Sequence, residues 1–281
     1  MSGEHVDGLA GWDSVRNKTK VLVVVVVALT VLGLFWAYHG IRAIGDARLV
    51  YVLFYLPAAV GCLVVAALTT VIMRQRLRSS VAPRTAVTVA SGAISFQMPR
   101  TLEWGYWVVF VLTVIASVTL AVGMWTDALT FPMSSGFDMV LPFVALALGL
   151  YGAVALIWLA MGFARFPTID CTPDDLVVQG FKARQQIRWS EIVDVEPVAS
   201  NNNLGLAITI ADGAHAQVHI NFIGPLAPAR RDLQRSITVA ADLFAVGADQ
   251  LLGFLQYYVK HPDARDELGD GRAVHRLNVA G

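Results

Sequence analysis

Six basic side chains in the C-terminal part of the chain are the residues best suited to bind another molecule. They are Lys182, Arg184, Arg188, Arg230, Arg231 and Arg235. Cationic side chains close to a membrane attract anionic headgroups, with about 1 kcal/mol for each charge. We therefore expect this basic cluster to contact headgroups or a partner protein. A charged face that meets only water explains the same residues, and both interpretations stay open at this point.

The remaining polar residues indicate no catalytic, cofactor or metal site. His215 and His219 lie four positions apart, but their segment has a strand pattern, and no Cys or carboxylate stands at zinc-ligand spacing. Cys171 has no evident His and Asn partners, and no G-x-S-x-G elbow, phosphate loop or dinucleotide fingerprint occurs. The loose candidates for an enzyme acting on lipid at the interface are Glu103, Asp194 and the two histidines.

The elements that position these residues begin with four apolar segments. The chain has 281 residues, of which 56% are hydrophobic and only 15% charged, against about 25% charged in an average soluble domain. Four segments lack Asp, Glu, Lys and Arg, and each is long enough to cross a hydrocarbon core of about 30 Å as a helix. They are Val21–Tyr38, Leu49–Met73, Trp104–Thr126 and Met139–Ala164. We expect four transmembrane helices within residues 21–164, the first of them an uncleaved anchor.

Basic residues in the short connections predict the orientation of these helices. Most of them precede the first span, lie in the second connection, or follow the last span: Arg16, Lys18, Lys20, Arg74, Arg76, Arg78, Arg84, Arg100 and Arg165. The first connection has only Arg42 and Arg48, and the third has none. By the positive-inside rule, both termini face the cytoplasm of a multi-pass protein of the cell membrane. Residues 1–20 would then form a cytoplasmic N-terminal tail.

The second connection contains a pattern of its own at residues 85–99. Val87 and Val89 alternate with polar residues, Ser91-Gly92 follows, and Ile94 and Phe96 resume the alternation. Alternation around Ser-Gly is typical of a β-hairpin. An isolated hairpin is only marginally stable, so we expect it to pack against the C-terminal domain. An amphipathic segment lying on the headgroups is the alternative.

From residue 165 the pattern changes to short strands separated by turn residues. The expected strands are Pro167–Cys171, Leu176–Phe181, Gln185–Trp189, Ile192–Ala199, Leu204–Ala211 and Ala216–Phe222. Their close spacing predicts an antiparallel meander, followed by a loop at Gly224–Arg235. An amphipathic helix is expected at Ala248–Lys260, where Leu251, Leu252, Leu255, Tyr258 and Val259 form an apolar stripe. Residues 269–281 are expected to form a flexible tail.

The run from Phe166 to Pro197 resembles the PH-like (pleckstrin-homology-like) domains of small bacterial membrane proteins. The shared pattern is a hydrophobic strand residue, an aromatic residue, a spacer, an acidic residue and Ile. Here these are Ile187, Trp189, Ser190, Glu191 and Ile192. Residues 248–269 also resemble the helix that closes such domains. The resemblance implies a cytoplasmic β-barrel with a capping α-helix at residues 165–268.

The same resemblance argues against phosphoinositide binding. Eukaryotic PH domains hold that ligand in a basic loop between their first two strands. The corresponding loop here contains Asp174 and Asp175, whose carboxylates would repel a phosphate. The resemblance therefore implies the fold and leaves the ligand open.

The segment from Gln185 to Pro197 is expected to form a corner between two strands. Ile187, Trp189, Val193 and Val195 share one parity and should face the core. Ser190-Glu191 interrupts this parity, which indicates a bend or bulge.

These features together predict a non-enzymatic integral membrane protein without a cofactor. It would present the PH-like domain for protein recruitment or for contact with the membrane surface. An accessory subunit of a larger membrane complex, for transport or envelope synthesis, is one alternative. An interfacial lipid-acting enzyme is the second. The balance of 21 basic and 21 acidic residues gives no global field that would attract nucleic acid.

Overall fold

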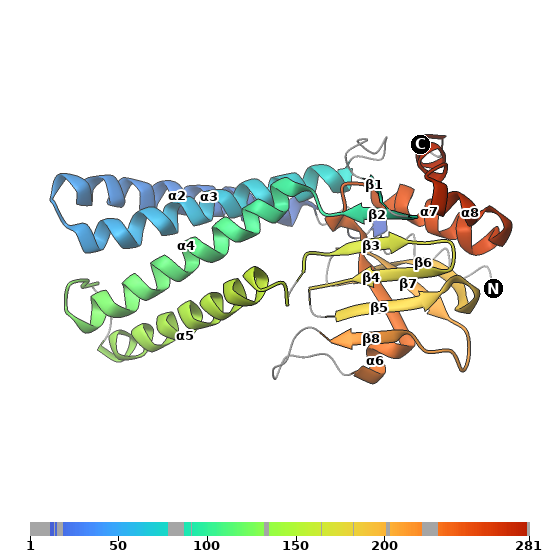
Figure 1. The fold of residues 1–281 in the computed structure, drawn as a ribbon. Coiled ribbons are helices and arrows are strands. Elements are labelled where there is room, and N and C mark those ends of the chain that lie inside the picture. The colour runs from blue at the N-terminus through green and yellow to red at the C-terminus, as the bar shows by residue number, and fades with distance from the viewer. Residues whose placement is uncertain are drawn as a thin grey trace. The chain divides into compact units, whose positions relative to one another are not determined.

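The computed structural model describes most of the chain. The described residues are 12–13, 15, 19–77, 87–90, 92–131, 135–163, 165–181, 183–200, 203–220 and 230–279. Two compact units are present (Figure 1). The helical unit comprises Val21–Val71 and Thr101–Gly162, and the β unit comprises Met1–Lys20, Ile72–Arg100 and Phe163–Gly281. The β unit is thus assembled from three parts of the chain that the helices separate.

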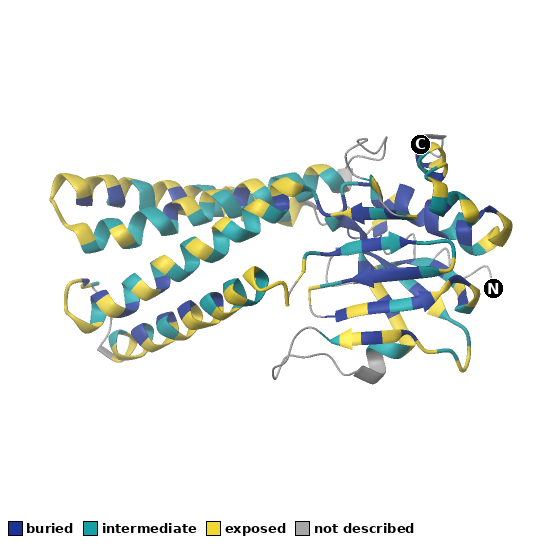
Figure 2. Ribbon diagram, in the orientation of Figure 1, coloured by how far each residue is buried: buried dark blue, intermediate teal, exposed yellow. Residues whose placement is uncertain are grey.

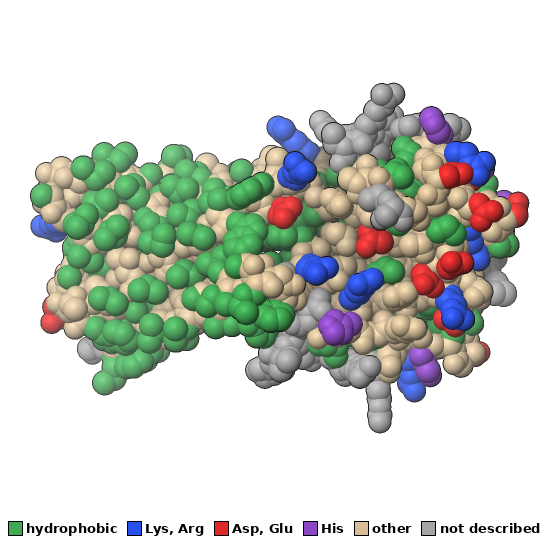
Figure 3. All heavy atoms as spheres, viewed as in Figure 1, with side chains coloured by type: hydrophobic (Ala, Val, Ile, Leu, Met, Phe, Trp, Pro, Cys, Tyr) green, Lys and Arg blue, Asp and Glu red, His purple; other side chains and the backbone are tan. Residues whose placement is uncertain are grey.

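Long apolar helices form the helical unit. They are α2 (Thr19–Gly45), α3 (Leu49–Leu77), α4 (Arg100–Trp125) and α5 (Ser135–Ala160). All four are long enough and apolar enough to cross a membrane, which confirms the four predicted spans by length and composition. Hydrophobic side chains predominate on their visible surface, where charged side chains are few (Figure 3), and much of each helix is exposed (Figure 2). Exposing so much apolar area is unfavourable in water and favourable in hydrocarbon.

Small residues allow two of these helices to approach closely. A Cβ atom added at Gly149 of α5 would meet Val118 Cγ2 at 3.2 Å and Ser117 Cβ at 3.4 Å on α4. The absence of large side chains at these positions lets the two helices pack within one bundle. Pro57 and Pro142 lie inside helices α3 and α5.

Two antiparallel sheets make up most of the β unit. Sheet A has the order β1-β2-β3-β4-β5-β8, and sheet B has the order β6-β7-β9. The strands of sheet A are β1 (Val87–Ala90), β2 (Ala93–Gln97), β3 (Thr168–Cys171), β4 (Asp175–Gln179), β5 (Ala183–Arg188) and β8 (Gln217–Ile220). The strands of sheet B are β6 (Ile192–Ser200), β7 (Asn203–Ile210) and β9 (Ser236–Ala240).

The hairpin between helices α3 and α4 belongs to sheet A. Strands β1 and β2 pair with each other across a turn in which Gly92 has a positive φ of 82°. Strand β2 then pairs with β3, in a register that places Ile94 opposite Cys171. Ile94 and Phe96 are fully buried in the core. Of the two interpretations of residues 85–99, the structure therefore has the hairpin, and it extends the C-terminal sheet.

A closed β-barrel, which the sequence predicted, is not found among the described residues. The chain leaves sheet A at the 3-10 turn η2 (Trp189–Glu191), and β6 starts a separate sheet. The second neighbour of β5 is β8, and the second neighbour of β7 is β9. Both pairings join strands that are not consecutive. The predicted meander is therefore correct for β3 to β5 and for the pair β6 and β7, and wrong at the steps from β5 to β6 and from β7 to β8. Side chains of both sheets and of helix α7 (Ala248–Lys260) share one core.

The predicted corner lies at η2, but one of its core residues was assigned wrongly. Ile187, Trp189 and Val195 are buried as expected, whereas Val193 is 57% exposed. The register between β6 and β7 shifts between Ile192 and Asp194. This bulge inserts an extra residue and reverses the side-chain parity, which turns Val193 outward and Ile192 inward.

The helices of the β unit extend the core at its C-terminal end. Helix α7 has the predicted bounds, and Leu251, Leu255 and Tyr258 of its apolar stripe are fully buried. Three short helical segments follow: η4 (Pro262–Ala264), α8 (Asp266–Asp270) and α9 (Ala273–Val279). The expected flexible tail at residues 269–281 thus contains helix α9, whose Ala273 and Leu277 are buried.

Two further segments differ from their expected structure. The predicted loop at Gly224–Arg235 includes a short helix, α6 (Arg230–Arg235), and strand β9 follows it directly; residues 221–229 lie outside the described part. The expected N-terminal tail at residues 1–20 contributes Trp12, which is 1% exposed in the core of the β unit. Its indole Nε1 donates hydrogen bonds to the carbonyl oxygens of Val198 and Gly205 at 3.1 and 3.0 Å.

Candidate functional site

A polar groove beside strands β5 and β8 is the candidate functional site. Its volume is about 740 Å³. Its polar lining residues are Arg184, Gln186, His215, Gln217, His219 and Gln234.

Charged side chains on the visible face of the molecule gather over the β unit and are nearly absent over the helices (Figure 3).

The alternation of strand β5 directs the groove side chains outward. Ala183, Gln185 and Ile187 are buried, whereas Arg184 is exposed and Gln186 is half-buried. Pairing with β8 places Arg184 opposite His219 and Gln186 opposite Gln217. Since paired residues on adjacent antiparallel strands have Cβ atoms about 4.5–5.5 Å apart, these four side chains lie next to one another on one face.

A buried glutamine holds the far wall of the groove in place. Gln185 is 6% exposed, and its Nε2 donates to the carbonyl oxygens of Leu233 and Ser236 at 2.6 and 3.2 Å. The Ala216 amide also donates to the Gln234 carbonyl at 3.1 Å. These bonds fix the junction of α6 and β9 beside β8, so that Gln234 reaches the groove.

The two ends of this face differ in charge, because a carboxylate offsets the arginine at one end only. Gln186 Nε2 donates to Asp175 Oδ2 at 2.8 Å, and the register places Asp175 opposite Arg188. An acidic residue therefore accompanies Arg188, whereas Arg184 has two histidines and amides around it. A guanidinium presents a planar fork of donors that matches a carboxylate or phosphate. The β8 end of the groove is accordingly suited to bind an anionic group.

The structure brings only part of the predicted basic cluster to the groove. Arg184 lines it, Arg188 is exposed on the same strand next to Asp175, and Arg235 ends helix α6 with an exposed side chain. Lys182 and the side chains of Arg230 and Arg231 lie outside the described part of the chain.

The residues considered for catalysis are dispersed. His215 and His219 both line the groove, but Asp194 belongs to sheet B, where its Oδ1 accepts a hydrogen bond from the Val195 amide at 2.7 Å. Glu103 belongs to helix α4 in the helical unit. Burial raises the pKa of the Cys171 thiol, which favours its neutral and unreactive form. Within the described residues, no three His, Cys, Asp or Glu side chains are grouped to hold a metal ion.

The amide side chains that line the groove could not be identified from the sequence. No sequence pattern marks a site at Gln186, Gln217 or Gln234. Gln185 does carry a signal, because a polar residue between Ala183 and Ile187 occupies a core-facing position of the strand. A buried amide of this kind needs hydrogen-bond partners, and the segment that supplies them lies next to the groove.

Comparisons with known proteins gave no match: no family model matched the chain, and neither did any curated protein or any solved structure. The resemblance to PH-like domains therefore stays a prediction from the sequence of Phe166–Pro197 and of residues 248–269.

Proposed function

We propose that the chain is a non-enzymatic multi-pass membrane protein that recruits a protein partner through the polar groove of its β unit. The observation that carries this proposal is the convergence of Arg184, His215 and His219 with three glutamine side chains in one groove. Four apolar helices connect the groove-bearing unit to a bilayer. The partner would present an acidic segment, whose carboxylate pairs with Arg184.

The groove chemistry suits an extended acidic peptide. Glutamine amides can donate to and accept from a peptide backbone, and Gln186, Gln217 and Gln234 line the groove beside Arg184. Asp175, which binds Gln186, would repel a second carboxylate at its end of the groove. The preferred segment therefore has its acidic residue at the β8 end and a neutral residue toward β4.

The proposed orientation rests on the distribution of basic residues. Lys and Arg are in excess before the first helix, between α3 and α4, and after α5. This excess supports a protein of the cell membrane whose β unit lies on the cytoplasmic side.

The β unit would be a divergent PH-like domain. This identity is supported by the strand, corner and strand of Ile187–Ile192 and by helix α7, which packs on the core after the last strand. Two separate sheets, with an added hairpin, would replace the closed barrel of that family.

The test is affinity capture from a membrane extract with mass spectrometry, followed by binding of the captured partner's acidic peptide to the purified full chain. The full chain is required because Trp12 and the β1–β2 hairpin belong to the β unit.

Arg184→Glu should weaken peptide binding by tenfold or more, since loss of a hydrogen-bonded charge pair costs about 2–5 kcal/mol. Arg188→Glu is the matched control, because it changes the same charge on the same strand beside Asp175. Binding that survives Arg184→Glu would contradict the proposal.

Contact with anionic headgroups is the second candidate, because Arg184 could equally pair with a phosphate. It predicts that inorganic phosphate competes with the peptide and that anionic vesicles bind the full chain in nanodiscs of neutral lipid. Binding of anionic vesicles that is unchanged in Arg184→Glu would exclude it. A partner retained by both variants would instead favour an accessory subunit that associates through its helices.

A further inference from the structure

Phe166 follows helix α5 closely along the chain and contacts Phe181 of the β unit. The positive φ of 72° at Gly162 stops the helix, and Phe166 comes four residues later. Its ring centroid lies 5.7 Å from that of Phe181, with the ring planes at 72°. The contact joins the start of the β unit to the turn between β4 and β5.

The level of the bilayer surface is constrained at this point of the chain. Residues 139–164 contain no charged side chain, and Arg165 is the first charged residue after α5. Because a charged side chain is unfavourable inside hydrocarbon, the edge of the hydrocarbon core should lie close to Arg165. An extended chain advances at most about 3.6 Å per residue, so Phe166 lies within about 14 Å of Gly162. Chain length alone thus keeps Phe166, and the Phe181 ring that it contacts, near the lipid headgroups.

Phe181 stands at the tip of a tight turn. The Gly180 amide donates to the Ala183 carbonyl at 2.8 Å, which closes the turn between β4 and β5. Phe181 directly follows Gly180, and its side chain is 37% exposed. Turns this short usually carry Asn, Asp or Gly, so the turn itself does not require a large apolar ring. Transfer of the exposed part of the ring from water into an apolar phase would be favourable.

The charges of the sequence differ between the two ends of strand β4. Arg165 precedes Phe166, and Lys182 follows Phe181. Arg165 is exposed, and so is Asp174, which stands at the other end of β4. Aromatic residues accompanied by Lys and Arg are typical of the boundary between membrane and water. The end of β4 that carries Phe181 therefore has the composition of a membrane-contacting surface, whereas the acidic end does not.

We propose that the β4–β5 turn inserts Phe181 into the headgroup layer of the bilayer that α5 crosses. The ring contacts the upper part of the acyl chains, Phe166 packs against it, and Arg165 pairs with lipid phosphates. The turn is then a second attachment point, which restrains the β unit beyond the covalent connection after α5. This inference requires that α5 crosses a bilayer, and it does not depend on peptide binding in the polar groove.

The test uses the full chain labelled with 5-fluorotryptophan in nanodiscs. Phe181→Trp keeps an aromatic ring at the turn and adds one ¹⁹F signal, and Asp174→Trp is the matched control at the far end of β4. A strand of five residues separates the two positions by roughly 17 Å. A lipid that carries a nitroxide near the headgroup end of its acyl chain should broaden the signal of residue 181 and leave that of residue 174 sharp. Unchanged signals of the buried Trp12 and Trp189 would show that both variants are folded.

The outcomes separate insertion from other contacts. A sharp signal from residue 181, or equal broadening at both positions, would overturn the proposal. Broadening should occur in neutral lipid, because the ring supplies the contact. Broadening that appears only with anionic lipid would assign the contact to the basic residues and overturn the role of Phe181.

A second pair of variants separates lipid contact from the contact between the two rings. Phe181→Ser and Phe181→Leu both remove the ring, but only Leu keeps an apolar group for the bilayer. In nanodiscs, Phe181→Ser should free the β unit and narrow the ¹⁹F signals of Trp12 and Trp189, whereas Phe181→Leu should leave them broad. Narrowing in both variants would assign the restraint to the ring contact with Phe166, and narrowing in neither would show that the turn restrains nothing.

Discussion

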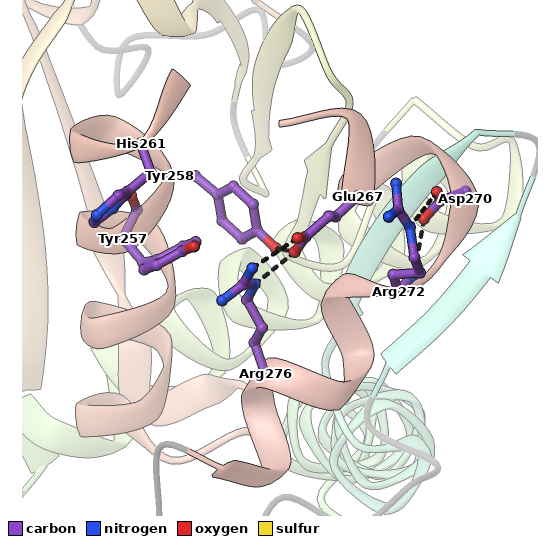
Figure 4. Close-up of polar contacts among 7 residues, drawn as sticks. All are labelled: Tyr257, Tyr258, His261, Glu267, Asp270, Arg272 and Arg276. Atoms are coloured by element: carbon purple, nitrogen blue, oxygen red, sulfur yellow. Dashed lines mark hydrogen bonds and ion pairs between the residues drawn. The ribbon is translucent and has the colours of Figure 1, made fainter. Parts of the chain in front are cut away.

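Glu267 is the residue that ties the three C-terminal helices together. It stands on α8 and accepts hydrogen bonds from Tyr258 of α7 and from Arg276 of α9 (Figure 4). Burial is the main cause that raises the pKa of Tyr258, and the nearby Glu267 carboxylate raises it further, so the phenol stays a donor. The ionised carboxylate of Glu267 therefore helps to hold α9 against α7, beside the buried contacts of Ala273 and Leu277.

This dependence gives a pH prediction. Hydrogen bonds from Arg276 lower the pKa of Glu267 below its ordinary value, which is about 4.3 in an unfolded chain. A carboxyl group with a depressed folded-state pKa adds stability above the unfolded value and loses it as the pH falls through the folded value. The thermal stability of the β unit should therefore fall as the pH drops below about 4.

Glu267→Gln should remove this component while it keeps the side-chain shape. The variant should melt earlier than the wild type at pH 7, and the two melting curves should converge as the pH is lowered. Asp263→Asn, at an exposed position of η4, is the control. A constant difference between wild type and Glu267→Gln from pH 7 to pH 3 would show that ionisation of Glu267 contributes nothing.

At the scale of elements, the β unit requires parts of the chain that are far apart. Trp12 bonds to Val198 and Gly205, 186 and 193 positions away. Gln256 Nε2 of α7 donates to the Val195 carbonyl at 2.8 Å. Both side chains thereby satisfy backbone carbonyls of β6 or β7. Among the described strands, β6 has a neighbour on one side only, so these contacts also protect an edge that could pair with another chain.

Replacement of Trp12 should therefore loosen sheet B. Trp12→Ala removes a large buried side chain, and such changes cost about 3–5 kcal/mol. Hydrogen exchange of the full chain in nanodiscs should show faster exchange across β6 and β7. Trp12→Phe keeps a ring but loses the indole donor, so its effect should be smaller. Exchange that is unchanged in Trp12→Ala would mean that the N-terminal segment is dispensable for the fold.

The sequence predicted those elements whose signal is local. The four spans follow from uninterrupted hydrophobicity, and helix α7 follows from the spacing of Leu251, Leu255 and Tyr258. The turn at η2 follows from the break in parity at Ser190 and Glu191.

Pairing between distant strands could not be predicted in this way. Local alternation gives a strand but not its neighbour, so the pairs β5 with β8 and β7 with β9 were missed. The bulge at Val193 was missed because a single inserted residue leaves the composition of the strand unchanged. The groove has the same origin, since Arg184 and His219 become neighbours only through the pairing of β5 with β8.

At the scale of the whole molecule, the fold of the β unit constrains the topology of the helices. Trp12, the β1–β2 hairpin and the region after α5 form one unit. These parts must then share one side of any bilayer that α2 to α5 cross. Two helices separate Trp12 from the hairpin, and two more separate the hairpin from β3. The chain would therefore cross the bilayer twice between Trp12 and the hairpin and twice between the hairpin and β3. Two crossings return the chain to the same side each time.

Cysteine labelling tests this topology. In the background Cys62→Ala, single cysteines replace Asp46 between α2 and α3, Ala128 between α4 and α5, and Asp212 after β7, all of which are exposed. Cys171 can stay, because it is fully buried and burial raises the pKa of its thiol. In intact cells a membrane-impermeant maleimide should label Asp46→Cys and Ala128→Cys. Asp212→Cys should react only after the membrane is permeabilised, if the β unit has the cytoplasmic orientation that we propose from the positive-inside rule. Labelling of all three in intact cells, or of only one of the two connections, would contradict a four-span protein with a single-sided β unit.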